Sequence, residues 1–180
     1  SYYFYMSWNP KYTIFLIIST MIDYISAIYM YKTENKTIRK FWLHASLISN
    51  FALLFTFKYF NFFNQTISDV LNAISIPFSP LTLKLILPVG ISFYTFQTLS
   101  YTIDIYRGKI KPERHLGIFA LYVSFFPQLV AGPIERGKNL LPQFFEKHKF
   151  NQLMFRSGLL LILWGMFKKV VIADRIADVV

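Results

Sequence analysis

Five apolar runs, each about the length of a membrane-spanning helix, alternate with short polar linkers along this chain. They cover residues 12–31, 41–63, 88–106, 116–134 and 153–173. A helix needs about 20 predominantly apolar residues to cross the hydrocarbon core of a bilayer. Of the 180 residues, 54% are hydrophobic and 16% are charged, and the mean hydropathy is +0.40. The sequence therefore predicts an all-α, polytopic integral membrane protein.

Composition and charge exclude several classes of function. The chain has no cysteine, so a disulfide framework, a thiolate metal site and a cysteine nucleophile are excluded. The net charge of +10 comes from Lys and Arg in short linkers, a placement that favours orientation against anionic membrane lipid over nucleic-acid binding. The sequence has no motif for a metal site, a nucleophile elbow or a phosphate-binding loop. We expect membrane lipid as a partner, no nucleic acid and no bound metal.

The basic residues of the linkers predict the orientation of the first three spans. Residues 32–40 hold four Lys or Arg and one Glu, whereas residues 64–80 hold one Asp and no Lys or Arg. The positive-inside rule places the first linker in the cytoplasm and the second outside, so we expect the N-terminus outside. The basic linker 107–115 then lies in the cytoplasm, as alternation requires.

The fourth run leaves two topologies open. The linker 135–151 is also basic, although a complete fourth span would place it outside. Pro127, Gly132 and Pro133 interrupt the helical pattern, as expected of a re-entrant or broken helix. A re-entrant segment, however, would place Lys168 and Lys169 outside, so each topology violates the charge rule once.

The other segments complete a prediction of about five transmembrane or re-entrant helices. Residues 140–150 are too short and too charged to span, and their apolar spacing predicts a short interfacial helix. No repeat, flexible linker or low-complexity tail indicates a second domain, so residues 1–180 are expected to be part of a single multi-span domain. The chain begins without a signal-like segment and stops directly after a span, from which we expect a fragment.

Polar residues inside the apolar runs need partners. A lone carboxylate in the first span, Asp23, is expected to face the protein interior, where hydrogen bonding between helices is favoured over substrate contact. Asp104 fits either pairing with a basic side chain or catalysis. Gln97 and Tyr101 are four residues apart, so they share a helical face that reaches toward Asp104. This polar strip fits either the lining of a cavity or a contact between helices.

Histidine is the usual general base for acyl transfer, so each histidine is a candidate. His115 and His148 lie in charged linkers, and His44 lies near the cytoplasmic end of a span. For all three we favour a position at the membrane interface over a catalytic role.

Four ordered blocks carry a resemblance to a known family. They are MSWNPKYTIFLIISTMIDY (6–24), LPVGISFYTFQTLSYTIDIYRG (87–108), SFFPQLVAGPIERGKNLLPQF (124–144) and GMFKKVVIADRIA (165–177). Together they resemble the membrane-bound O-acyltransferase family, specifically its alginate O-acetyltransferase branch. The residues Pro127-Gln128-Leu129 and Ala131-Gly132-Pro133 fit this branch better than the related D-alanyl transfer branch.

The resemblance implies a multi-pass enzyme of the cytoplasmic (inner) membrane that moves an acetyl group onto hydroxyls of a cell-envelope or exported polysaccharide. It implies acetyl-CoA or an acyl carrier as donor, no bound cofactor, and a periplasmic or extracellular acetyltransferase as partner protein. The family's near-invariant histidine lies downstream of these blocks, and no residue of this chain matches it. We therefore expect no catalytic residue within residues 1–180 and no activity of this stretch alone.

Seven residues are candidates for the substrate path: Gln97, Tyr101, Asp104, Gln128, Gly132, Pro133 and Arg136. Backbone amides freed by proline and glycine at 131–134 are expected to bind an oxyanion or a carbonyl, and Arg136 to neutralise an anionic donor or sugar acid. In the alternative interpretation, Gly132 permits close helix packing and Arg136 marks the membrane interface.

Two other classes of function are alternatives to an acyltransferase. A secondary transporter also contains broken helices and charges near the membrane midplane, but it predicts inverted repeats, which the sequence does not show. A noncatalytic membrane subunit of a polysaccharide export complex predicts normal acetylation after Gln128→Ala or Arg136→Ala.

Overall fold

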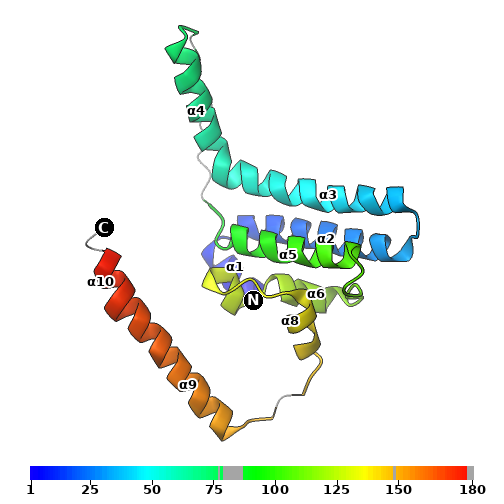
Figure 1. The fold of residues 1–180 in the computed structure, drawn as a ribbon, viewed down its shortest axis with the longest axis vertical. Helices are drawn as coiled ribbons and strands as arrows, with labels where there is room; N and C mark the ends of the chain where they lie inside the picture. Colours follow the sequence, from blue (N-terminus) through cyan, green and yellow to red (C-terminus); the bar gives the residue numbers. More distant parts are fainter. Residues whose placement is uncertain (77, 79–86, 148, 178–180) are drawn as a thin grey trace. The chain divides into compact units, whose positions relative to one another are not determined.

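All regular secondary structure in the described part of the chain is helical, which confirms the predicted all-α class (Figure 1). This computed structural model describes residues 1–76, 78, 87–147 and 149–177. The chain divides into two compact units, Ser1–Phe145 and Glu146–Val180.

The first unit is built around three helices that pack against one another, α2, α3 and α5 (Figure 1). Its elements are α1 (Tyr2–Trp8), α2 (Pro10–Lys32), α3 (Lys36–Leu54), η1 (Phe55–Tyr59), α4 (Phe60–Ala73), α5 (Ile91–Tyr106), α6 (Leu116–Val123), α7 (Phe126–Ala131) and α8 (Gly137–Gln143). Asparagines begin the first two long helices: the Asn9 side chain accepts the Lys11 amide of α2, and the Asn35 side chain accepts the Thr37 amide of α3.

The second apolar run extends further as helix than the sequence predicts. The π-helical turn η1 joins α3 to α4, and the helix changes direction there (Figure 1). The predicted linker 64–80 is helical as far as Ala73. The polar side chains there support a helix instead, because the Gln65 amide donates to the Asp69 carboxylate one turn on, at 2.9 Å.

The fourth run is a broken helix. α6 ends at Val123, and α7 begins again at Phe126 with a proline in its first turn. The helix predicted over 140–150 is displaced: α8 covers Gly137–Gln143, and the described residues between Gln143 and residue 151 are not helical. A side chain at position 137 would meet Tyr101, because a Cβ there would lie 2.9 Å from the Tyr101 Cδ2 atom.

The second unit consists of α9 (Gln152–Phe167), η2 (Lys168–Ala173) and α10 (Asp174–Ala177). The Asn151 side chain accepts the amides of Leu153 and Met154 and thereby begins α9. Together α9 and η2 cover the fifth predicted run.

By length and composition, one described helix qualifies to cross a membrane. It is α2, with 23 residues, and Leu116–Leu129 is a shorter apolar helical stretch. The multi-pass arrangement of the other runs stays a prediction.

A buried network of polar side chains connects α2, α3 and α5. Asp23 is fully buried and faces the interior, as the sequence predicts. Its carboxylate accepts hydrogen bonds from the Ser46 hydroxyl at 2.6 Å and from the Asn50 amide at 2.8 and 3.0 Å. The side-chain oxygen of Asn50 in turn accepts hydrogen bonds from the hydroxyls of Ser19 at 3.0 Å and Thr98 at 3.3 Å. Asn50 therefore links all three helices.

We predict that Asn50→Leu destabilises the full-length protein by about 3 kcal/mol, because it leaves the buried Asp23 carboxylate without its amide donor. The matched control is Gln65→Leu, which removes an exposed amide from α4 and is expected to cost less than about 0.5 kcal/mol. Chemical unfolding of the detergent-solubilised proteins measures both. Equal stability of the two variants would contradict a central role for this network.

Candidate functional site

Residues 115–137, here called the returning segment, leave one end of α5 and come back to it. Just before its start, the Tyr101 hydroxyl accepts the Glu113 amide at 2.8 Å. At the tip, a Cβ on Gly90, which precedes α5, would lie 2.0 Å from the Leu129 carbonyl oxygen. At the return, Gly137 lies against Tyr101. Figure 1 shows this yellow stretch running back along α5 toward α8.

Two of the candidate residues, Gln97 and Gln128, bind each other and fix the returning segment to α5. The Gln97 amide donates to the Gln128 side-chain oxygen at 3.0 Å and to the Tyr122 carbonyl at 2.9 Å. Both glutamines are buried. Of the two roles left open for Gln97, this geometry is that of a contact between helices.

Tyr101 belongs to an aromatic cluster beneath the returning segment. Its ring centroid lies 4.9 Å from that of Phe119 and 5.8 Å from that of Tyr122. The Tyr122 hydroxyl donates to the Glu135 carbonyl at 3.3 Å, which joins the outgoing helix to the returning chain. Tyr101 is fully buried, so its ring packs beneath the returning segment and is not open to a ligand.

Asp104 and Arg136 line one cavity of about 230 Å³, together with Ser100, Ile103 and Arg107. The Asp104 carboxylate lies 3.9 Å from the ammonium nitrogen of Lys109, which is the pairing with a basic side chain that the sequence allowed. A carboxylate, a hydroxyl and two guanidinium groups around one small space can accept a sugar hydroxyl and bind an anionic group.

Gly132 and Pro133 lie where α7 ends. A Cβ on Gly132 would lie 2.5 Å from the Gln128 Cα atom, so a side chain at this position would collide with the preceding helical turn. The Gly132 amide donates to the Gln128 carbonyl at 3.1 Å and is thus already bound. These contacts are local to the end of α7. Pro133 is exposed.

The two described histidines make local contacts with the backbone. The Nδ1 atom of His44 lies 2.7 Å from the Lys40 carbonyl, and the Nδ1 atom of His115 accepts the Ile118 amide at 3.3 Å at the start of α6. Both side chains are exposed. His148 lies outside the described residues.

Sequence reasoning missed Ser100 and Arg107 as neighbours of Asp104. The signal was present, because positions 100, 104 and 107 follow the spacing of one helical face. The meeting with Arg136 had no such signal, since it depends on the path of the returning segment.

Curated relatives align with nearly the whole chain. The peptidoglycan O-acetyltransferase of Helicobacter pylori is 37% identical over 205 aligned residues, covering 98% of this chain and 38% of the relative. The probable alginate O-acetylase AlgI of Pseudomonas aeruginosa is 34% identical over 98% of this chain and 34% of the relative. The protein of that name in Pseudomonas syringae is 35% identical over 99% of this chain and 34% of the relative.

The chain spans about a third of the length of these relatives. No family model and no solved structure matches it.

We predict that Gly90→Ala destabilises the full-length protein by about 3 kcal/mol, because the new methyl group would collide with the Leu129 backbone. Gly108→Ala is the matched control: Gly108 has a φ of 71°, close to the 73° of Gly90, but a Cβ there meets no atom within 4 Å. The control is expected to lose only about 1 kcal/mol. Thermal unfolding in detergent measures both, and equal losses would contradict the close contact at the tip.

Proposed function

Because the chain belongs to the membrane-bound O-acyltransferase family, we propose that the full-length protein transfers acetyl groups to hydroxyls of a cell-envelope or exported polysaccharide. Similarity to O-acetyltransferases over 98% or more of the chain carries this proposal. The names of these relatives give peptidoglycan and alginate as acceptors, which share sugar hydroxyls. The acceptor class is therefore proposed as a polysaccharide.

The donor and the partner protein are part of the same proposal. The acetyl group needs an activated donor, and acetyl-CoA and an acyl carrier are the donors proposed. A partner acetyltransferase on the outer side of the membrane would complete delivery to an exported polymer.

The described residues support binding and positioning in this reaction. Acyl transfer to a sugar needs a general base to take the hydroxyl proton, and the family resemblance places that histidine downstream of this chain. Within the chain, Arg107 and Arg136 are suited to neutralise an anionic donor group or a sugar acid. Asp104 and Ser100 are suited to orient a hydroxyl. The Gln97–Gln128 contact ties the returning segment, which carries Arg136, to α5.

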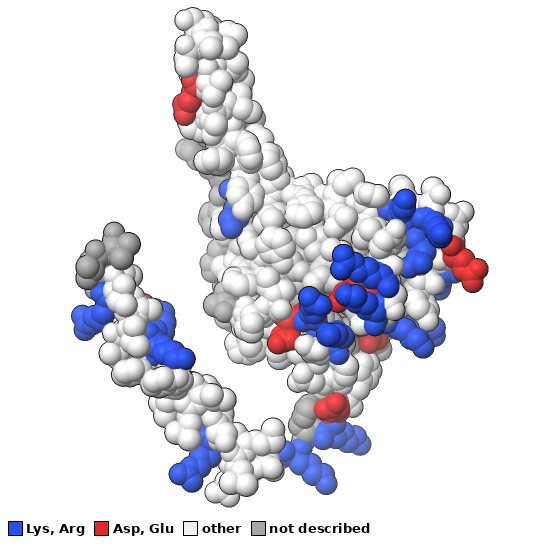
Figure 2. All heavy atoms as spheres, viewed as in Figure 1, with Lys and Arg blue, Asp and Glu red and all other residues white. Residues whose placement is uncertain are grey.

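We further propose that the protein is a multi-pass protein of the inner membrane, with three basic stretches on the cytoplasmic side. Two are the linkers 32–40 and 107–115, and the third begins at Arg136. Figure 2 shows Lys and Arg gathered where these stretches meet. The path of the returning segment supports this arrangement, because it brings Arg136 beside Arg107.

We predict that deleting the full-length gene abolishes polysaccharide acetylation, and that Arg136→Gln lowers it by about tenfold or more through loss of a charge-assisted contact. Released acetate per unit of polymer measures the effect in complemented cells. Lys138→Gln removes the same charge from α8 without altering the cavity of Asp104, and it is expected to retain acetylation.

Membrane levels of each variant need to be equal for this comparison. Full acetylation in the deletion strain would defeat the enzyme assignment in favour of a transporter or an export subunit. If only the Arg136→Gln variant kept full acetylation, the cavity would have no part in the reaction.

The topology generates a separate prediction for single cysteines in a full-length background free of other reactive cysteines. We expect Glu34→Cys, Lys111→Cys and Lys138→Cys to react with an impermeant maleimide only from the cytoplasmic side, and Asp69→Cys only from outside. All four positions have half-buried or exposed side chains. Labelling of intact cells and of inverted vesicles measures the side. Reaction of Lys138→Cys from outside would show that residues 116–134 cross completely.

A further inference from the structure

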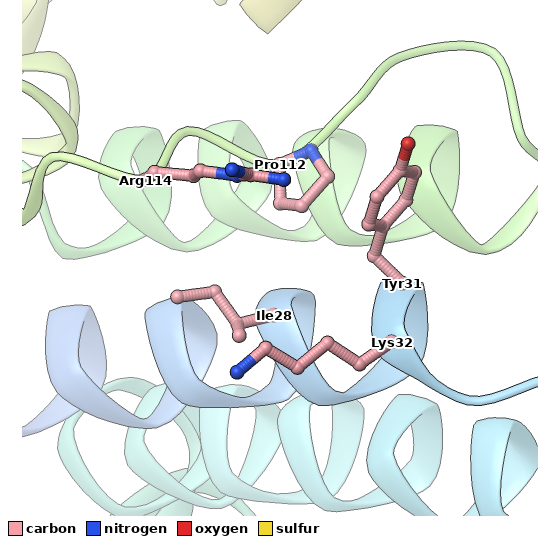
Figure 3. A pocket seen from close by; sticks show the side chains of 5 residues that line it. All are labelled: Ile28, Tyr31, Lys32, Pro112 and Arg114. Carbon is pink, nitrogen blue, oxygen red and sulfur yellow. The ribbon is translucent and has the colours of Figure 1, made fainter.

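A second cavity, of about 330 Å³, lies between the last turn of α2 and the stretch that precedes α6 (Figure 3). It is lined by Ile28, Tyr31, Lys32, Pro112 and Arg114. None of these residues lines the cavity of Asp104 and Arg136. The two cavities are therefore separate sites.

Two cations at this cavity, Lys32 and Arg114, have no ion-pair partner among the described residues. Glu113 adjoins the site, but its carboxylate accepts the His115 amide at 2.8 Å. By contrast, Arg39 on α3 has a structural role, because its guanidinium donates to the Tyr106 carbonyl at 2.7 Å.

The wall that carries Arg114 is fixed in place. The Tyr24 hydroxyl of α2 donates to the Arg114 carbonyl, and the Tyr101 hydroxyl of α5 accepts the Glu113 amide. Pro112, which directly precedes Glu113, is buried. A site whose backbone is already held loses little conformational freedom when a ligand binds.

The cavity changes from apolar to cationic along α2. Ile28 lies one turn before Lys32, and Figure 3 shows the Lys32 side chain running back beside it while Arg114 approaches from the opposite wall. α2 is also the described helix with the length and composition of a membrane span, and Lys32 is its last residue. At the end of a span, an apolar floor with a cationic rim matches the junction between the acyl chains and the phosphate of a lipid.

We propose that this cavity binds the phosphodiester headgroup of an anionic phospholipid. The inference rests on the membrane placement proposed above and does not depend on the acetyl transfer. The Arg114 guanidinium provides the fork of donors that suits phosphate oxygens, and Lys32 adds a second positive charge. Ile28 contacts the glycerol end of the lipid.

The test measures binding of phosphatidylglycerol to the purified full-length protein in neutral detergent, by native mass spectrometry across a lipid titration. Lys32→Gln/Arg114→Gln is expected to weaken binding about tenfold or more. The control Lys36→Gln/Lys40→Gln removes the same charge from the start of α3, outside the cavity, and is expected to change binding less than about twofold. A second variant, Lys32→Arg/Arg114→Lys, keeps both charges and is expected to retain binding.

Three results would overturn the proposal: equal binding by the two neutralised variants, equal binding of phosphatidylglycerol and phosphatidylcholine, or displacement of the lipid by millimolar inorganic phosphate. The last result would assign the cavity to a soluble phosphate compound. Acetylation in cells is scored separately. Lipid binding without acetylation would defeat only the enzyme assignment, and acetylation without lipid binding would defeat only this site.

Discussion

The hydrogen bonds between Asp23 and Asn50 are the interaction on which the three central helices depend. A carboxylate with no exposed surface is costly unless its oxygens are bound. Here Ser46 and Asn50 supply the donors, and the Asn50 side-chain oxygen also accepts hydroxyls from α2 and α5. Apolar packing alone does not fix the rotation of one helix against another, because many rotations bury similar areas. The network permits only the rotation that brings these groups together.

The returning segment relies on that frame through α5. One side of α5 faces the Asp23 network through Thr98, and the side with Gln97 and Tyr101 binds the segment. Consecutive positions on one helix thus serve two different partners. This division explains why α5 has a buried polar residue in almost every turn although its sequence is largely apolar.

Much of this arrangement could be predicted from the sequence, and the failures have physical causes. Hydrophobic runs predicted α2, α5 and α9, and the cost of an unpaired carboxylate predicted that Asp23 faces the interior. The extension of α4 was missed because polar residues on a helix that pair one turn apart look like a linker in a hydropathy profile. The meeting of Asp104 with Arg136 was not predictable, because it joins residues 32 positions apart through a path that no local pattern specifies.

The contact between Gly90 and Leu129 has a consequence for the order of assembly. The tip of the returning segment packs against backbone at the start of α5 with no room for a side chain between them. Its glutamine and tyrosine contacts are also made with α5. The tip of the segment therefore cannot make these contacts until α5 is in place. Synthesis from the N-terminus supplies α5 first, so the template is present when the last residues of the segment emerge.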